Sequence, residues 1–386
     1  MQPLRIGIIA AEPSGDLLAA GLMRALKAEM PQLQFEGVAG PLMMNEGIDQ
    51  WEPMDSLSVM GLFEVLHHLP RLLRLRGQIL ARWRDTPPAL FIGVDAPDFN
   101  LTVETRLRER GIPTVHYVSP TVWAWRTSRV KTIRRAVDLL LTIFPFENAF
   151  LESHQVSAHY VGHPLAGEMP LRPDRAGARE RLGIPGDAPV LAVLPGSRSG
   201  EVGRLARPFL QTAQVLQREI DGLRVVVPLV NDRTRDLLMA ERQRYTPSLN
   251  AQVVVGDARN AMAAGDVVLT ASGTATLEGL LSKRPMVVGY KVQAATYWLA
   301  RLLKLVKVPH VAMANLLADE RLAPELIQHD CEPEHLLPPL RRFFQDDALR
   351  ERIAARYTEI HQSMRSDTNR EAAAAVIALM KERGIV

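Results

Sequence analysis

The sequence lacks the short motifs that mark the commonest cofactor- and metal-dependent enzymes. It has no Gly-x-Gly pair and no Gly-Lys-Ser or Gly-Lys-Thr, which the dinucleotide fingerprint and the P-loop require. It also has no Asp-x-Asp, no His-Glu-x-x-His and no Gly-x-Ser-x-Gly. These absences argue against a dehydrogenase, a P-loop ATPase, a zinc hydrolase and an α/β-hydrolase. No cofactor and no bound metal are expected.

The sequence is also poor in cysteine, aromatic residues and net charge. The single cysteine, Cys331, excludes an internal disulfide and fits a reducing compartment. A net charge of +3 and 5% aromatic residues argue against a dedicated nucleic-acid binder. No apolar run reaches the roughly 18 residues of a membrane span, and the first run is too short for a signal peptide. We therefore expect a cytoplasmic protein, with contact to a membrane surface left open.

Short apolar runs alternate with amphipathic stretches along the 386 residues. This length exceeds the size of most single cores, and the alternation predicts parallel βαβ units. We expect an α/β protein with two Rossmann-like domains facing a cleft, residues 1–165 and 166–365. A C-terminal helix at 366–386 is expected to cross back and pack on the first domain, its own or a partner's. The expected strands are Leu4–Ala10, Phe35–Val38, Ala89–Val94, Thr114–Val118, Leu139–Phe144, Val190–Leu194, Leu223–Val230, Ala251–Val255, Val267–Thr270 and Pro285–Gly289.

Two turns in the second half, Pro195–Arg198 and Ala271–Glu278, each join an apolar run to a helical stretch. Small residues in such turns leave backbone N–H groups free to point at an anion, and the helix dipole adds partial positive charge. The guanidinium of Arg198 suits phosphate, and the Glu278 carboxylate is placed to accept from ribose hydroxyls. The pattern predicts a nucleotide-diphosphate site formed by Ser197, Arg198, Ser272, Gly273, Thr274 and Glu278.

In the first half, Asp95 directly follows the expected strand Ala89–Val94. A carboxylate at the carboxyl end of a parallel strand faces the crevice where open α/β sheets bind ligands, and it can serve there as a general base. The alternative is that Asp95 or Asp98 caps a helix starting near Asn100, with Asp98 and Asn100 better placed as caps. Position alone leaves both interpretations of Asp95 open.

Other candidates for the first domain's site are polar and aromatic residues that follow strands. Glu12, Ser14 and Asp16 occupy the first strand-to-helix turn, where ligand contact competes with ordinary turn and capping chemistry. Trp123 and Trp125 follow another strand, and they either pack in the core or form a wall of the acceptor site. His163 lies beside a proline, a context in which histidine is more often structural.

Two stretches mix apolar residues with cations and suit a headgroup interface or an acyl-bearing ligand. The alternative for each is an amphipathic helix that packs on its own sheet with its cations outward. The candidate membrane-facing or acyl-facing residues are Leu62, Phe63, Leu66, Leu69, Leu72 and Leu73 in the first stretch, and Tyr297 and Trp298 in the second.

Ten motifs follow one another over more than 300 residues, namely Glu12–Asp16, Val59–Gly61, Asp95–Asn100, Tyr117–Trp125, Phe144–Glu147, Gly162–His163, Leu194–Arg198, Ala271–Glu278, Pro285–Lys291 and Asn315–Leu317. In this order they resemble the lipid-A-disaccharide synthase family of Gram-negative bacteria. In that family the first turn usually reads Gly-Glu-Ala-Ser-Gly-Asp, whereas this chain has Ala11 and Pro13 in place of the glycine and the alanine. The substitution is expected to stiffen that turn.

The resemblance implies the two-domain GT-B fold and an inverting glycosyltransferase without a metal. The implied reaction transfers 2,3-diacylglucosamine from UDP to the 6-hydroxyl of 2,3-diacylglucosamine 1-phosphate (lipid X), giving a β-1,6 linkage and UDP. Asp95 matches the family's base, Arg198 and the Ser272–Thr274 turn would stabilise the leaving diphosphate, and Glu278 would hold ribose. Asn315 would lie near the diphosphate or uracil. The acyl chains imply peripheral association with the inner membrane, and a homodimer is left open.

Three rival interpretations are kept beside this one. A UDP-N-acetylglucosamine 2-epimerase shares the fold and the UDP site but needs no second sugar. A non-catalytic binding protein for a nucleotide sugar or lipid would bind the UDP-sugar without releasing UDP. A membrane-surface scaffold would have no use for the phosphate-binding turns.

Overall fold

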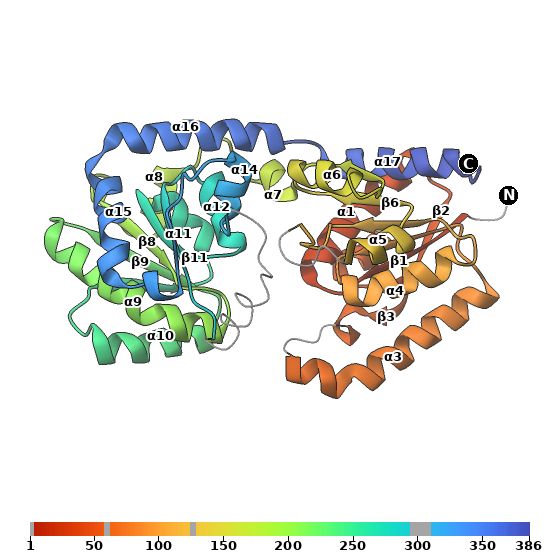
Figure 1. The fold of residues 1–386 in the computed structure, drawn as a ribbon, viewed down its shortest axis with the longest axis horizontal. Coiled ribbons are helices and arrows are strands. Elements are labelled where there is room, and N and C mark those ends of the chain that lie inside the picture. Colours follow the sequence, from red (N-terminus) through yellow and green to blue (C-terminus); the bar gives the residue numbers. More distant parts are fainter. Residues whose placement is uncertain (1–3, 58–61, 124–128, 294–309) are drawn as a thin grey trace. The chain divides into compact units, whose positions relative to one another are not determined.

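The computed structural model describes residues 4–57, 62–123, 129–293 and 310–386, with the side chains of 62–68 outside the description. The chain divides into two compact units, residues 1–167 with 364–386, and residues 168–363. The boundaries expected from the sequence, 165/166 and 365/366, lie close to these divisions. Each unit contains one parallel sheet with helices on both faces, which confirms the prediction of two Rossmann-like domains (Figure 1).

The first unit has a seven-stranded sheet in the order β3-β2-β1-β4-β5-β6-β7, and all of its neighbouring strands pair in parallel. Its strands are β1 (Leu4–Ala10), β2 (Leu33–Ala39), β3 (Asp49–Pro53), β4 (Leu90–Val94), β5 (Thr114–Tyr117), β6 (Leu139–Thr142) and β7 (Ala158–Tyr160). Its helices are α1 (Pro13–Glu29), α2 (Pro41–Asn45), α3 (Leu62–Asp85), α4 (Pro97–Arg108), α5 (Val130–Ala136), α6 (Pro145–Glu152) and α17 (Thr368–Glu382), with α7 (Pro164–Glu168) at the division.

Two apolar layers cover the faces of this first sheet. On one face, α1 and α17 pack together over the central strands, with side chains such as Leu22 and Val376 fully buried. Figure 1 shows the C-terminal helix α17 beside α1, so the last helix of the chain completes the first unit as the sequence predicted. On the other face, α3 and α4 bury Trp83, Phe91 and Leu107.

The second unit has a six-stranded parallel sheet in the order β10-β9-β8-β11-β12-β13. Its strands are β8 (Val190–Leu194), β9 (Arg224–Leu229), β10 (Ala251–Val255), β11 (Val267–Ala271), β12 (Met286–Tyr290) and β13 (Glu325–Ile327). Its helices are α8 (Arg175–Arg181), α9 (Ser199–Glu219), α10 (Asp232–Tyr245), α11 (Ala258–Ala264), α12 (Thr274–Leu281), α14 (Met313–Ala318), α15 (Pro333–Gln345) and α16 (Asp347–Met364).

Candidate active site

The first sheet changes its winding direction between β1 and β4. These two strands are neighbours, pairing as far as Ala10 with Val94, whereas the strands that follow each of them extend the sheet in opposite directions. Open α/β sheets bind ligands outside the carboxyl ends of their strands at such a switch point. Glu12 follows β1, with Ser14 and Asp16 in the first turn of α1, and Asp95 follows β4, so two of the predicted site segments lie at neighbouring strand ends.

The turn that carries Asp95 has an unusual backbone. Asp95 and Ala96 have φ angles of 52° and 43°, and Val118, which follows the adjacent strand β5, has 78°. Left-handed backbone is uncommon for residues other than glycine, and it is an outlier for a β-branched residue. Each such residue costs about 1–3 kcal/mol, and such strain gathers at functional sites. The Asp95 N–H donates to the Tyr117 carbonyl at 2.8 Å, which ties the turn to β5.

The capping interpretation of Asp95, Asp98 and Asn100 is wrong. Helix α4 begins at Pro97, earlier than expected. Its N-cap residue is Ala96, and the described residues include no side-chain capping hydrogen bond there. Asp98 is exposed and forms an ion pair with Arg129, while the buried Asn100 donates to backbone carbonyls. The half-buried carboxylate of Asp95 makes no hydrogen bond or ion pair with the residues that the structure describes. Among the described residues the Asp95 carboxylate therefore has no structural partner, and its role as a general base stays a prediction.

The first strand-to-helix turn divides into exposed and buried members. Glu12 and Ser14 are exposed, as their predicted contact with the acceptor requires. Asp16 is buried, and its carboxylate accepts from the backbone N–H groups of Gly40, Leu42 and Met43 at 2.9–3.1 Å. Asp16 therefore holds the start of α2, and a direct ligand contact for its carboxylate stays a prediction that these bonds do not require.

A buried carboxyl group that sequence reasoning did not select as a site residue lies near the same edge, at the start of α6. Glu147 accepts from the Trp123 indole N–H and the Phe144 backbone N–H, both at 3.1 Å. Burial raises its pKa to about 7, although these hydrogen bonds oppose the shift. The rings of Trp123 and Phe146 meet edge to face. The available signal was the carboxylate of Glu147 within an aromatic run, and its near-neutral pKa marks a functional-site candidate.

His163 lies against this aromatic group, 5.1 Å from the Phe144 ring between centroids. Its Nδ1 accepts from the Leu165 N–H at 3.2 Å, and burial lowers its pKa to about 4, so the ring is neutral near pH 7. This geometry accounts for His163 as a structural residue. Trp125, the predicted wall of the acceptor site, lies outside the described residues.

The second sheet has its switch point between β8 and β11. The two turns predicted to bind a diphosphate follow these two strands, so they also lie at neighbouring strand ends. In each sheet, therefore, the segments selected from sequence converge on the position where an open α/β sheet binds its ligand.

The turn after β8 is occupied by the chain's own carboxylate. Glu201 Oε2 accepts from the N–H groups of Ser197 and Arg198 at 3.1 and 3.3 Å, so the expectation that these groups are free is wrong. Gly196 has a φ of 118°, and a Cβ there would lie 2.6 Å from that of Glu201. The Arg198 side chain is 83% exposed, with one nitrogen 3.6 Å from Glu201. Its guanidinium remains accessible to an anion.

The turn after β11 differs because no described side chain caps the helix that follows it. Gly273, the N-cap residue of α12, has a φ of 143°, and both Gly273 and Thr274 are exposed. Ser272 donates to the Val311 carbonyl at 3.1 Å, and Thr276 donates to the Gly273 carbonyl at 2.8 Å. These bonds shape the turn and leave its helix N-terminus exposed, which fits the predicted anion site.

The predicted ribose and uracil contacts differ in their accessibility. Glu278 is partly exposed and lies 3.4 Å from the Arg259 guanidinium. Asn315 is fully buried: its amide donates to the Ala323 carbonyl and to Glu325, and its oxygen accepts from the Ala323 N–H. Asn315 thus supports the loop next to α12, and its predicted nucleotide contact stays untested.

The first cationic-apolar stretch forms helix α3, which has two kinds of leucine. Leu72 packs against the apolar cluster beneath the helix. Leu69 and Leu73 are 41% and 47% exposed. The other predicted contacts of these stretches, Leu62, Phe63, Leu66, Tyr297 and Trp298, lie outside the described side chains. None of the helices in the described part of the chain is long and apolar enough to cross a membrane.

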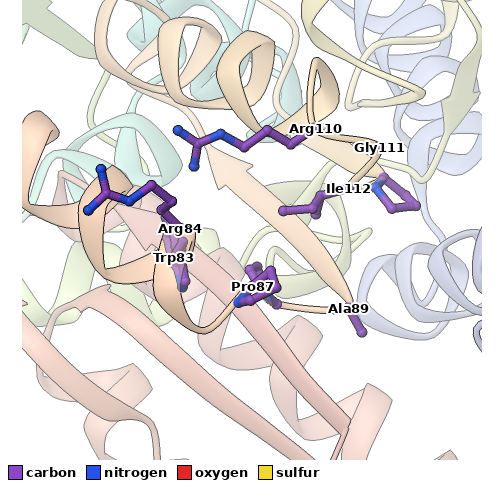
Figure 2. A pocket seen from close by; sticks show the side chains of 9 residues that line it. Trp83, Arg84, Pro87, Ala89, Arg110, Gly111 and Ile112 are labelled. Carbon is purple, nitrogen blue, oxygen red and sulfur yellow. The ribbon is translucent and has the colours of Figure 1, made fainter.

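The described residues also include a cavity that none of the predicted site residues reaches. It has a volume of about 330 Å³ and lies at the amino ends of β4 and β5, the opposite edge of the sheet from Asp95. Figure 2 shows Arg84 and Arg110 at its walls. Within the described residues no three His, Cys, Asp or Glu side chains are grouped to hold a metal ion, and metal independence stays a prediction.

Comparison with solved structures defines the class of fold. A glycosyltransferase from Rickettsia africae superimposes with a TM-score of 0.57 at 12% identity, covering 98% of both chains. A UDP-GlcNAc 2-epimerase from Neisseria meningitidis, solved with UDP-GlcNAc, gives 0.61 at 10% identity and covers 98% of this chain and 99% of that one. At these identities the likeness concerns the fold alone, which is the GT-B fold of two Rossmann-like domains.

Sequence comparison then places the chain within that class. A family model described as lipid-A-disaccharide synthetase matches residues 6–379. Lipid-A-disaccharide synthase from Serratia proteamaculans is 47% identical over 380 residues, which covers 98% of this chain and 99% of that protein. The chain belongs to the lipid-A-disaccharide synthetase family, whose members are glycosyltransferases of lipid A biosynthesis. The epimerase alternative is not favoured, because the epimerases share the fold at far lower identity.

Proposed function

We propose that this enzyme transfers 2,3-diacylglucosamine from its UDP derivative to the 6-hydroxyl of lipid X. The acceptor oxygen forms the new bond to the sugar C1 as the bond from C1 to the UDP diphosphate breaks. The hydroxyl proton passes to Asp95, and UDP leaves with the bonding electrons. Family membership supports the reaction, and the placement of the predicted residues at both switch points supports the roles of the residues.

The observation that carries the role of Asp95 is its carboxylate on a strained turn at the first switch point, without a partner among the described residues. The carboxylate of a structural aspartate normally accepts hydrogen bonds from the backbone or pairs with a cation, as Asp16 does at the start of α2. The Asp95 carboxylate has no such partner among the described residues, so it is available to accept a proton from the acceptor hydroxyl.

The second domain supplies what a leaving diphosphate needs. Arg198 presents an exposed guanidinium, and α12 presents an N-terminus after Gly273 that no described side chain caps. Both stabilise the negative charge that grows on UDP as the glycosidic bond breaks. Glu278 would hold the ribose hydroxyls, with Arg259 orienting its carboxylate.

We also propose that α3 contacts the inner membrane surface, where both acylated substrates reside. Leu69 and Leu73 are exposed beside Arg71 and Arg74, which are exposed as well. Exposed leucines flanked by arginines suit the boundary between anionic headgroups and acyl chains.

The reaction is tested by mass analysis of products from UDP-2,3-diacylglucosamine, with and without lipid X. The expected result is a disaccharide 1-phosphate and one UDP per disaccharide, both dependent on lipid X. Consumption of the donor without lipid X, giving an isomer of unchanged mass, would contradict transfer and favour epimerisation.

A further inference from the structure

A buried polar cluster lies beneath the Asp95 turn and has no part in the reaction as proposed. Asn100 and Glu104 lie one helical turn apart on α4, and His116 lies on β5; none of the three exposes any surface. Polar side chains are costly to bury unless their hydrogen bonds are made. A cluster of three at this position therefore needs a reason.

Asn100 bonds to the turn itself. Its amide nitrogen lies 2.8 Å from the Asp95 carbonyl, 3.3 Å from the Val94 carbonyl and 3.5 Å from the Ile9 carbonyl. One side chain thereby bridges the ends of the two strands that form the switch point. The shortest bond holds the peptide between Asp95 and Ala96, whose flanking residues are both left-handed.

Glu104 and His116 hold α4 close to the sheet behind this contact. Glu104 Oε1 lies 2.6 Å from His116 Nδ1. Gly93 is the strand partner of His116, and a Cβ at Gly93 would lie 2.2 Å from Glu104 Oε1 and 2.9 Å from Asn100 Cβ. The close approach of the helix thus depends on glycine at that position. Burial raises the pKa of Glu104, and His116 opposes the shift.

The cluster is not an optimal way to fill a core. Asn100 Oδ1, Glu104 Oε2 and His116 Nε2 have no hydrogen-bond partner within the described part of the chain. Apolar residues of similar size would avoid this cost, but they could not donate to the carbonyls at the switch point. The polar atoms are therefore best explained by what Asn100 does to the turn.

We propose that Asn100 is a positioning residue for glycosyl transfer. Its amide holds the Asp95–Ala96 turn in the left-handed conformation, and Glu104 with His116 keeps α4 near enough for that contact. This inference rests on the proposed role of Asp95 as the base. Neither Asp95 nor Ala96 favours this conformation as glycine does, so an external contact is needed to fix the direction of the carboxylate.

The test is a double-mutant cycle between Asn100→Ala and Asp95→Asn, with kcat and the KM for the donor measured for each enzyme. A misplaced catalytic group costs on the order of 100-fold in rate, so we expect Asn100→Ala to lower kcat by about that factor. The donor KM should change by less than about threefold. Because Asn100 acts through Asp95, the double variant should be no slower than Asp95→Asn alone.

Thr114→Val is the matched control, since it removes buried hydrogen bonds to Ala136 and Asp138 at the other end of β5. It should lower the melting temperature and leave kcat unchanged. If Asn100→Ala does not fold, Asn100→Ser keeps one donor and enters the same cycle, with a smaller loss expected. Losses that multiply in the double variant, or a kcat that Asn100 substitution leaves unchanged, would overturn this inference alone. Near-wild-type activity of Asp95→Asn would overturn the proposed base and this inference together.

Discussion

The switch points of the two sheets carry different chemistry on the same architecture. The first presents a carboxylate, Asp95, on a turn whose left-handed residues are not glycine. The second places glycine at its left-handed positions, Gly196 and Gly273, and presents a guanidinium and a helix N-terminus. A turn that directs a functional side chain needs a residue other than glycine, whereas a turn that exposes backbone N–H groups is best formed by residues with small side chains. This difference is the basis of the proposed separation of proton transfer from anion binding.

The two anion-type turns of the second domain also differ from one another. After β8, Glu201 accepts from the backbone N–H groups, so Arg198 is the accessible group there. After β11 the helix N-terminus itself is exposed. Similar sequences therefore supply a cationic side chain at one turn and a backbone dipole at the other. The next three predictions concern Arg198, Glu147 and helix α3, and they run from the largest expected effect among them to the smallest.

Arg198→Ala should weaken UDP binding by about 10- to 100-fold, because a charge-assisted hydrogen bond contributes roughly 1.5–3 kcal/mol. Arg198→Lys should restore only part of the affinity, since lysine lacks the planar fork. Isothermal titration calorimetry with UDP measures both variants. Arg218→Ala, an exposed arginine in the last turn of the same helix, is the control and should bind as wild type does. Equal affinity in Arg198→Ala would remove Arg198 from the site.

Glu147→Gln, a substitution near the carboxyl edge of the first sheet, should change how the stability of the protein depends on pH. The pKa of Glu147 is raised from 4.5 to about 7 in the folded protein, so between these values the folded state holds a proton that the unfolded state has released. Stability therefore falls as pH rises through this window and stays lower above it, by an amount on the order of 3 kcal/mol. The variant lacks this loss, so its melting temperature relative to wild type should rise from pH 5 to pH 7.5.

Glu152→Gln, an exposed substitution on the same helix, provides the control for that pH series. Its melting temperatures should run parallel to those of wild type. If the melting temperatures of Glu147→Gln also run parallel to those of wild type, the buried carboxyl group does not titrate in this range. Asp95 would then remain the acid–base candidate at the carboxyl edge of the first sheet.

The smallest effect is expected on membrane association. The Leu69→Ser and Leu73→Ser pair should reduce co-sedimentation with anionic liposomes at low salt and leave the melting temperature unchanged, because both leucines are exposed. Leu72→Ser should do the reverse, since Leu72 packs on the core cluster. Unchanged sedimentation of the pair would remove α3 from the membrane contact.

The central strands of both sheets could be predicted from sequence because they are continuous apolar runs buried on both faces, as β8 and β11 show. The strands β3, β7 and β13 were not predicted. Each lies at a sheet edge, has three to five residues and is only partly buried, so its sequence carries little apolar pattern.

The candidate site was predictable where its chemistry is local. Asp95 and the small residues after β8 and β11 follow strands directly, and the strand order then brings them to the switch points. The contact of Glu201 with this turn was not predictable, because the N-cap residue is Arg198 and the capping-box signature requires Ser or Thr there. The contact between Glu104 and His116 was not predictable either, because the two residues lie on different elements and no sequence spacing marks their pairing.

The most direct test of this account compares Asp95→Asn with Arg198→Ala for turnover and UDP affinity in the same preparations. Asp95→Asn should lose about 100- to 10,000-fold in kcat, as expected for a general base, while it binds UDP as wild type does. Arg198→Ala should show weakened UDP binding. Retention of more than about a tenth of wild-type activity by Asp95→Asn would contradict its role as the base. Loss of UDP affinity in that variant would contradict the separation of proton transfer from anion binding.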